Sequence, residues 1–455
     1  MGKALVVGLA RSGVGAANLL RAMGRDVTVT DLRTEAELTP QTAKLVPGVV
    51  RALGGHPGGI FADADLIVVS PGVPLDIEPL RHARQAGKKI IGELELACGL
   101  LEGIPVYAVT GTNGKSTTVT LLDLMLSKAG KRTLLAGNIG NALSEEILNR
   151  VNGTMRVKGV DCAVIEVSSF QLEAIERFRP SGAAILNITP DHMDRYASMD
   201  EYRAAKAAIA ANQTEEDFLV LNAEDPECAK VHEAVKKSGK PASWTFSSRR
   251  RVKGVYLEGR DVLYDLGPAG KGTLIAAGDI RIKGIPNLEN AMAASAMALL
   301  ASCPPEAVRE ALREFPGLEH RMEFVRELDG VAYINDSKGT NVGAVARSLE
   351  GFTSPVVLIA GGRDKGGDFT QLERQVKEKV KALVLIGEAA EKIGRALCGL
   401  TRCWNEDSLA SAVRRAREVA SPGDTVLLSP GCASFDMFED FEDRGRKFKE
   451  LVGRL

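Results

Sequence analysis

Short apolar runs alternate with amphipathic helical patterns through the first 97 residues of the chain. Four of the runs are typical of buried strands, and two helical patterns lie between them. The expected strands are Ala4–Val7, Val27–Thr30, Leu66–Ser70 and Lys89–Ile91, and the expected helices are Val14–Met23 and Ile77–Ala86. Strands and helices that alternate in this way predict a small, doubly wound parallel sheet of the Rossmann-like type.

Strand and helix patterns also alternate in residues 98–315, but the pattern differs in one segment of this region. Between residues 251 and 283, short apolar runs alternate with glycine turns, which is typical of antiparallel hairpins. An alanine-rich segment at 290–301 predicts a buried helix. The other elements expected here are strands at Val106–Val109, Arg132–Ala136, Asp161–Val167, Ala183–Ile188 and Phe218–Asn222, and a helix at Thr117–Ala129. The pattern predicts a central α/β domain with a small antiparallel sheet.

Residues 316–455 show a third alternating pattern, which predicts a second Rossmann-like domain. The strands expected in it are Ala332–Asn335, Val356–Ala360, Ala382–Ile386 and Thr425–Leu428. A helix with an apolar stripe is expected at 437–452. The expected organisation is therefore three α/β domains, at 1–97, 98–315 and 316–455.

Composition changes this picture little. Of the 455 residues 45% are hydrophobic and 26% charged, as in an ordinary soluble protein, and the net charge of −1 argues against general affinity for nucleic acid or anionic membranes. The seven cysteines form no CxxC pair, and buried reduced thiols are the expectation for them. The chain opens directly on a strand pattern rather than a signal peptide, and its longest apolar run, Ala291 to Cys303, is too short to span a bilayer. We expect a cytoplasmic protein.

The strongest chemical signal follows the strand at Val106–Val109. The loop Gly111-Thr112-Asn113-Gly114 leads into Lys115-Ser116 and then into a helix. Glycines let a backbone approach phosphate, a helix N-terminus and a lysine favour its charge, and a serine hydroxyl can ligate Mg²⁺. Residue 109 is valine where a Walker A motif has glycine, so the loop predicts a phosphate site in a P-loop-like ATPase domain without matching that motif.

The first domain carries a weaker signal. Gly8, Gly13 and Gly15 follow its first strand, and Asp31 ends the second, where an acidic residue can contact a ribose or a base. GLARSGVG is not the G-x-G-x-x-G fingerprint, so an ordinary strand–helix turn stays open as the alternative. A second loop, Ser70–Pro74, is expected at the same sheet edge.

Polar groups at other strand ends suggest phosphoryl transfer. Glu166 ends a central strand and, with Ser116, offers oxygen ligands for Mg²⁺. His192 and Lys206 are ambiguous by position alone, because a loop histidine held in a turn and a solvated helix lysine are the commoner cases.

Several motifs resemble those of the Mur ligases, over all three domains and in order. They are TGTNGKST at Thr110–Thr117, SSFQLE at Ser168–Glu173, DHMDRY at Asp191–Tyr196, the Asn287 and Asn290 pair, His320-Arg321, DSKGTN at Asp336–Asn341, and the tail SPGCASFDMFEDFEDRG. The first motif is shared with folylpolyglutamate synthases. SSFQLE and DHMDRY, with a lysine at 206, are more specific and resemble the members that add D-glutamate.

The resemblance implies an ATP-dependent amide-forming reaction in peptidoglycan precursor synthesis, and so a part in cell-wall biogenesis, cell shape and cell division. ATP would phosphorylate the carboxylate of UDP-N-acetylmuramoyl-L-alanine, and the amine of D-glutamate would attack the acyl phosphate. The enzyme would be a monomer with ATP and two Mg²⁺ sites.

The resemblance also implies a role for each candidate residue. The catalytic residues would be Lys115, Glu166, His192 and Lys206, and the metal ligands Ser116, Glu166, His192 and Lys206 as a carbamate formed from CO₂. ATP would contact Gly111, Thr112, Asn113, Gly114, Lys115, Ser116, Thr117, Asn287, Asn290, His320, Arg321 and Asp336.

The remaining candidate residues would contact the two other substrates. Asp31, Leu32 and Arg33 would meet uracil; Arg11, Ser12, Gly13 and Gly72 the pyrophosphate and sugar; and Asn138, Ser168 and Gln171 the muramoyl-alanine part. D-Glutamate would contact Lys338, Thr340, Lys365, Ser434 and Phe441, because two lysines suit a dicarboxylate.

Three alternatives stay open at this point. A folylpolyglutamate synthase would share the phosphate loop but lack a nucleotide-binding domain before it. An NAD-dependent oxidoreductase would use residues 1–97 and leave DHMDRY unexplained. A nucleotide-regulated switch protein would bind ATP without turnover that depends on an acceptor.

Overall fold

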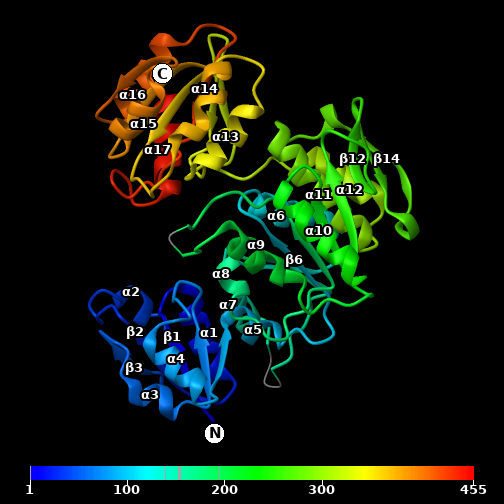
Figure 1. Ribbon diagram of the computed structural model, residues 1–455, viewed down its shortest axis with the longest axis vertical. Helices are drawn as coiled ribbons and strands as arrows, with labels where there is room; N and C mark the ends of the chain where they lie inside the picture. Colours follow the sequence, from blue (N-terminus) through cyan, green and yellow to red (C-terminus); the bar gives the residue numbers. More distant parts are fainter. Residues whose placement is uncertain (1, 139, 152–154, 194) are drawn as a thin grey trace. The chain divides into compact units, whose positions relative to one another are not determined.

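The computed structural model describes residues 2–138, 140–151, 155–193 and 195–455, and it contains three β-sheets that follow one another along the chain (Figure 1). Ile139 and Asp194, the latter within the DHMDRY motif, lie outside the described residues. The predicted fold class is confirmed, because each sheet is combined with helices in an α/β arrangement.

The first sheet has five parallel strands in the order β3-β2-β1-β4-β5. The four strands predicted from sequence are present, while β3 was not predicted because it is an edge strand with half-buried and exposed positions. Its strands are β1 (Lys3–Val7), β2 (Asp26–Asp31), β3 (Val50–Leu53), β4 (Leu66–Val69) and β5 (Lys89–Gly92), and the helices of this region are α1 (Arg11–Ala22), α2 (Thr39–Thr42), α3 (Gly58–Asp63), α4 (Glu78–Gln85) and α5 (Glu93–Cys98).

The central sheet has nine strands in the order β14-β13-β12-β11-β10-β9-β6-β8-β7. The pairs from β7 along the sheet to β12 are all parallel. The pairs β12–β13 and β13–β14 are antiparallel, as predicted for residues 251–283. The strands are β6 (Val106–Thr110), β7 (Thr133–Gly137), β8 (Cys162–Glu166), β9 (Gly182–Ile185), β10 (Phe218–Asn222), β11 (Ala242–Ser247), β12 (Gly254–Glu258), β13 (Asp261–Asp265) and β14 (Lys271–Ala276).

The helices of the central region begin with the one that follows the phosphate loop. The predicted alanine-rich helix is present but starts at Ile285, earlier than predicted. The α-helices are α6 (Lys115–Lys128), α7 (Leu143–Leu148), α8 (Ser169–Leu172), α9 (Met199–Ala207), α10 (Pro226–Ser238), α11 (Ile285–Leu300) and α12 (Pro305–Glu314), and short 3₁₀ turns lie at Ala208–Ala210, Gly267–Ala269 and Ala277–Asp279.

The third sheet has six strands in the order β15-β16-β20-β17-β18-β19, of which β15 is antiparallel. The four predicted strands are present, and the tail helix begins at Phe441 rather than at 437, because the Asp440 carboxylate caps it by accepting from the Asp443 N–H at 2.6 Å. The elements are β15 (Glu323–Leu328), β16 (Val331–Asn335), β17 (Val356–Gly361), β18 (Val380–Ile386), β19 (Arg402–Asn405), β20 (Thr425–Leu428), α13 (Val342–Glu350), a 3₁₀ turn at Phe369–Leu372, α14 (Glu373–Lys379), α15 (Ala390–Leu397), α16 (Leu409–Val419) and α17 (Phe441–Gly453).

The chain divides into two compact units. The first contains the first two sheets (Met1–Ile188, His192–Ile280 and Glu289–Glu314), and the second contains the third sheet (Thr189–Asp191, Arg281–Leu288 and Phe315–Leu455). Within the first unit one apolar core continues from the N-terminal sheet into the central one, where α7 packs against α1 and α5. The domain boundaries after residues 97 and 315 stay predictions.

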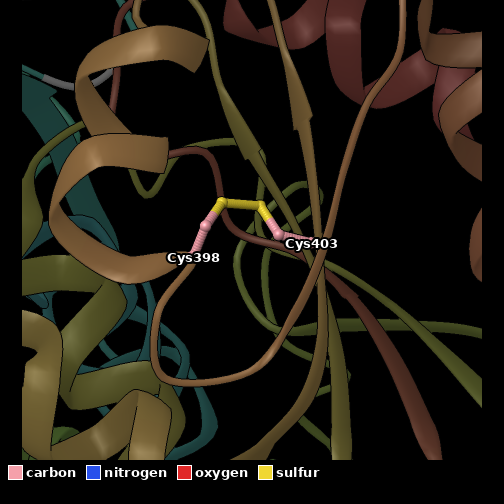
Figure 2. The surroundings of a disulfide bond; sticks show 2 residues. All are labelled: Cys398 and Cys403. Carbon is pink, nitrogen blue, oxygen red and sulfur yellow. A yellow bond between two sulfur atoms is a disulfide. The ribbon is translucent and has the colours of Figure 1, made fainter.

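The cysteines depart from expectation at one pair. Figure 2 shows a disulfide between Cys398, which follows α15, and Cys403 in β19, with the two Cα atoms 5.3 Å apart. Their C-x₄-C spacing gave no signal in the sequence. Cys162, Cys303 and Cys432 are buried, as expected for thiols in apolar runs.

Within the part of the chain that the structure describes, no helix is both long and apolar enough to cross a bilayer.

Gly361, at the end of β17, offers a test of the third sheet. Its φ is +120°, and a Cβ there would lie 1.9 Å from the Ile386 carbonyl oxygen, whereas Gly366 in the same loop has φ +79° and open space around it. Both alanine substitutions carry backbone strain, but only Gly361→Ala adds a steric overlap worth about 1–3 kcal/mol. We expect thermal unfolding of the full chain to show a lower Tm for G361A than for G366A; equal values would contradict the packing described.

Candidate active site

The phosphate loop lies at the carboxyl edge of the central sheet, between β6 and α6. Asn187, which follows β9, clamps it: the Thr112 N–H donates to the Asn187 carbonyl at 2.9 Å, and the Asn113 N–H to its side-chain oxygen at 2.8 Å. The Asn187 amide donates in return to the Asn113 carbonyl at 3.0 Å. Gly114 then takes a left-handed conformation (φ +87°), and α6 begins at Lys115. The loop thus has a fixed shape that opens onto a helix N-terminus.

Lys115 and Ser116 begin α6 with a cation and a hydroxyl. The Lys115 ammonium donates to the carbonyls of Gly111 (2.9 Å) and Thr112 (3.0 Å). The Ser116 hydroxyl donates to Glu166 Oε2 at 2.6 Å, and the other oxygen of that carboxylate accepts from the Asn138 amide at 2.9 Å. Residues from the ends of β6, β7 and β8 therefore meet at one point.

Asn290, predicted to contact ATP, lies against this loop. A Cβ added to Gly114 would be 2.2 Å from the Asn290 side-chain oxygen, so the glycine makes room for the amide. Asn287 belongs to the second unit, where its amide donates to the Lys283 carbonyl at 2.9 Å.

Lys206 reaches the phosphate loop from α9. Its side chain is only 2% exposed, its ammonium donates to the Gly111 carbonyl at 3.0 Å, and it lies 4.5 Å from the centre of the Tyr202 ring. The predicted residues Lys115 and Lys206 thus share one backbone acceptor, and Lys206 is not the solvated helix lysine that its position alone left open.

His192 is held by the SSFQLE and DHMDRY motifs, which interlock. Its φ of +57° is unusual for a residue other than glycine, and its ring centre lies 4.8 Å from that of Phe170. The Tyr196 hydroxyl donates to Glu173 at 2.6 Å, and the Arg195 guanidinium pairs with the same carboxylate while stacking 4.6 Å over the Phe170 ring. A hydrogen-bonded aromatic cluster therefore fixes the histidine.

One cavity of about 730 Å³ in the first unit connects these groups with the first sheet. Thr112, Lys115, His192 and Lys206 line it on the central side. Among the described residues, the predicted substrate contacts Arg11, Ser12, Asp31, Leu32, Arg33, Gly72, Asn138, Ser168 and Gln171 line it as well. The prediction for Gly13 differs from the structure: a Cβ there would lie 2.0 Å from the Gly8 carbonyl oxygen, so the residue packs beneath the first glycine loop instead of lining the cavity.

Several lining residues were not predicted, among them His56, Glu93, Phe170 and Tyr202. Phe170 is the apolar aromatic member of the SSFQLE motif, and that position in the motif is the signal in the sequence that marks it. His56 follows the unpredicted strand β3 in a glycine-rich loop, which gave no signal of its own.

Asp31 has an unusual environment for a carboxylate predicted to meet uracil. Its oxygens accept from the Leu9 N–H (2.7 Å), the Arg33 N–H (2.9 Å), and two guanidinium N–H groups of Arg33 (3.0 and 2.9 Å). Burial alone would raise the pKa of Asp31, but these hydrogen bonds outweigh it and lower the pKa to about 2. The carboxylate is therefore charged and held in place by Arg33.

The residues predicted to hold Mg²⁺ fit that ion in part. Ser116 and Glu166 place two oxygen donors together, which Mg²⁺ prefers. Lys206 lines the same cavity as His192, but an amine becomes an oxygen ligand only as a carbamate. Within the described residues, no three His, Cys, Asp or Glu side chains cluster as a metal site.

In the second unit, loops at the ends of β16, β17 and β20 lie together, because these strands are neighbours in the sheet. The Lys338 ammonium lies 3.5 Å from the centre of the Phe441 ring, and the Arg363 N–H donates to the Ala433 carbonyl at 3.0 Å. The Gly431 N–H also donates to the Gly339 carbonyl at 2.8 Å and joins these two pairs, so the segments that carry the predicted D-glutamate residues lie together: Lys338, Thr340, Lys365, Ser434 and Phe441.

The side chains of Asp336 and His320 are buried next to these loops. The Asp336 carboxylate accepts from the Ser348 and Ser429 hydroxyls, both at 2.8 Å, and burial raises its pKa to about 6 against these hydrogen bonds. The His320 ring is 2.9 Å from the Asn335 amide, and its carbonyl accepts from the Lys338 N–H at 3.0 Å. Arg321, the neighbour of His320, is half-buried.

Comparison with known protein families finds three matches in succession. The models described as "Mur ligase MurD-like, N-terminal domain", "Mur ligase middle domain" and "Mur ligase, glutamate ligase domain" match residues 2–92, 109–298 and 320–432. Together they cover most of the chain, in the order of its three sheets.

Similar proteins and structures agree with these matches. A UDP-N-acetylmuramoylalanine–D-glutamate ligase from Geotalea uraniireducens (strain Rf4) is 47% identical over 454 residues, and one from Koribacter versatilis (strain Ellin345) is 42% identical over 454; each alignment covers 100% of this chain and 97% of the relative. A pseudomurein peptide ligase type C from Methanothermus fervidus has a similar fold (TM-score 0.62, 19% identity), as has UDP-N-acetylmuramate-alanine ligase MurC from Thermotoga maritima (TM-score 0.59, 21% identity), each over 100% of both chains.

Gly114 tests the phosphate loop. Gly114→Ala would force alanine into a left-handed conformation and against Asn290, a cost of about 1–2 kcal/mol from the backbone alone, so ATP affinity should fall roughly tenfold. Gly130, which follows α6, has a similar φ of +80° and open space around it, so Gly130→Ala is the matched control. Calorimetric titration with ATP measures the affinity of each variant. Equal affinities for G114A and G130A would contradict the assignment of this loop to phosphate binding.

Proposed function

The chain belongs to the Mur ligase family, and from this premise we propose that it joins D-glutamate to UDP-N-acetylmuramoyl-L-alanine at the expense of ATP. The observation that carries the proposal is the single cavity that runs from the phosphate loop to the loops of the first sheet. Such a cavity suits a long substrate with a nucleotide at one end and a reacting carboxylate at the other. The choice of D-glutamate rests on the name that the relatives share.

The chemistry requires activation of a poor electrophile. The terminal carboxylate would attack the γ-phosphate of ATP and expel ADP, which forms an acyl phosphate. The amine of D-glutamate would then attack the acyl carbon, lose a proton and displace phosphate through a tetrahedral intermediate. Such transfers depend mainly on positioning and on neutralising charge. The N-terminus of α6 and the Lys115 ammonium would supply that charge at the β- and γ-phosphates.

The ATP contacts belong to this proposal as a set. They are the loop residues Gly111, Thr112, Asn113, Gly114, Lys115, Ser116 and Thr117, the amides Asn287 and Asn290, and His320, Arg321 and Asp336.

Ser116 and Glu166 would hold one Mg²⁺, whose charge offsets that of the phosphate oxygens. His192 and Lys206, the latter as a carbamate, would hold a second. The Lys206 ammonium would lose one proton, and the neutral amine would add CO₂ with loss of a second, which replaces a cation by an anionic oxygen donor. The buried position of Lys206 in the wall of the cavity supports this role.

The nucleotide substrate would extend from the phosphate loop into the first sheet. Asn138, Ser168 and Gln171 would bind the muramoyl-alanine part next to Glu166. Ser168 and Gln171 are ordered by a reciprocal capping box on α8, in which the Ser168 N–H donates to Gln171 at 2.9 Å. Arg11, Ser12 and Gly72 would bind the pyrophosphate and sugar, and Leu32 and Arg33 would lie at the base beside Asp31.

The D-glutamate pocket would be formed by Lys338, Thr340, Lys365, Ser434 and Phe441. Two ammonium groups would pair with the two carboxylates of the amino acid, and the Phe441 ring would hold Lys338 in position. The reaction would serve peptidoglycan precursor synthesis in the cytoplasm, and so cell-wall biogenesis, cell shape and cell division, with the enzyme acting as a monomer.

The acceptor requirement tests the proposal directly. ADP release should need both UDP-N-acetylmuramoyl-L-alanine and D-glutamate, because phosphate transfer leads to product only when the amine attacks. A coupled assay that omits each substrate in turn measures this. Release that continues without D-glutamate, or that L-glutamate supports equally, would refute the proposal.

Lys206→Ala tests the carbamate. Turnover should fall on the order of 100-fold because a charged oxygen ligand is lost, and short carboxylates such as acetate should restore part of it. Lys230→Ala, on the exposed face of α10, is the control and should keep full activity. If acetate restores no activity to a folded K206A protein, the carbamate assignment is wrong.

A further inference from the structure

His56 lies in the wall of the substrate cavity, in the glycine-rich loop that follows β3. It lines the cavity together with Asp31, Leu32 and Arg33, which come from the end of the neighbouring strand β2. In the proposed function the reacting carboxylate lies near Lys115 on the central side, so the base of the nucleotide would extend toward this part of the first sheet. That binding mode would put His56 beside the base.

Asp31 offers the base little capacity to accept hydrogen bonds. A carboxylate has about four lone-pair positions, and four N–H groups from Leu9 and Arg33 already donate to this one. An acceptor for the base in this region has to come from another residue.

The hydrogen bonds of Thr30 determine which nitrogen of His56 carries the proton. The Thr30 hydroxyl has a single hydrogen, which it donates to the Gly55 carbonyl at 2.8 Å. The same hydroxyl oxygen lies 3.0 Å from His56 Nδ1, so in this pair Nδ1–H must donate and the hydroxyl must accept. In a neutral imidazole with the proton on Nδ1, Nε2 carries a lone pair and is an acceptor.

The surroundings of the ring keep it neutral and oriented. Burial lowers the pKa of His56, and the nearby charge of Asp31 opposes that effect without reversing it. Phe61 packs against the ring edge-on, with ring centres 6.2 Å apart and an interplanar angle of 84°. Thr30 and Phe61 thus hold an imidazole whose remaining polar atom is Nε2.

We infer that His56 determines base specificity, with Nε2 accepting a hydrogen bond from the imide N–H of uracil. Cytosine has a lone pair at the same ring position, so two acceptors would face each other and the base would be rejected. The inference rests on the proposed function, because it assumes a uridine nucleotide in the cavity. It adds a residue that the sequence motifs did not mark.

Competition by UDP and CDP against the uridine-linked substrate tests the inference. The wild-type protein should bind UDP on the order of tenfold more tightly than CDP. UDP gains one neutral hydrogen bond to Nε2, whereas the lone pair of CDP at the same position is repelled by it. His56→Phe keeps a ring against Phe61 but removes the acceptor. This variant should lower the affinity for UDP about three- to tenfold and leave the affinity for CDP within about twofold of the wild-type value.

His232→Phe is the matched control. His232 lies half-buried on α10, outside the cavity lining, and burial lowers its pKa as it does for His56. This variant should keep the UDP preference of the wild-type protein. Thr30→Val removes the acceptor for Nδ1–H while nearly preserving shape, and should reduce the preference for UDP without abolishing binding.

The tautomer gives a readout independent of turnover. Nitrogen NMR shifts of His56, assigned with the H56F variant, should show a protonated Nδ1 and an unprotonated Nε2 whose shift changes when UDP is added. A proton on Nε2, or a UDP-to-CDP ratio that H56F leaves unchanged, would overturn the inference while ligase turnover continues. Absence of any turnover with the uridine-linked substrate would instead overturn the proposed function, and the inference with it.

Discussion

The clamp of Asn187 on the phosphate loop is the interaction on which the rest of the site depends. Its three hydrogen bonds hold the backbone of Thr112 and Asn113 to the end of β9. Individually each contributes on the order of 1 kcal/mol, but together they decide which way the loop carbonyls and N–H groups point. The N–H groups of Thr112 and Asn113 point to Asn187, and the carbonyls of Gly111 and Thr112 accept from the ammonium groups of Lys115 and Lys206. A different loop shape would leave both lysines without these acceptors.

Much of the fold could be predicted from the sequence, because buried parallel strands are continuous apolar runs. Strands such as β6 and β20 needed no other information. Among the strands that were missed, β3 is a partly exposed edge strand, and β11 and β19 mix polar and apolar residues. Their positions depend on pairing with distant strands, which a local pattern does not encode. The same limit explains why the start of α17 was placed too early, since the Asp440 cap outweighs the apolar stripe before it.

The site was predictable to the extent that it follows sheet topology. Ser116 and Glu166 end up together because β6 and β8 are neighbours, and the strand-end rule predicts this. His192 and Lys206 could be assigned only by resemblance to a family. Their place in the cavity depends on the packing of Phe170, Tyr202 and the Glu173–Arg195 pair, contacts between segments that lie apart in the chain. Asp31 shows the converse. Its position at the end of β2 was predicted, but the hydrogen bonds that the Arg33 guanidinium donates to its carboxylate were not.

The Gly111 carbonyl oxygen accepts from both Lys115 and Lys206, at 2.9 and 3.0 Å. A carbonyl has two lone pairs, so the two ammonium groups saturate it. In the proposed carbamate the Lys206 nitrogen keeps one N–H but loses its positive charge, so its attraction to this oxygen would weaken. The chemical state of Lys206 would then affect, through a single backbone oxygen, the surroundings of Lys115. Under the proposed carbamylation, dissolved carbon dioxide would in this way alter the electrostatics of the phosphate loop.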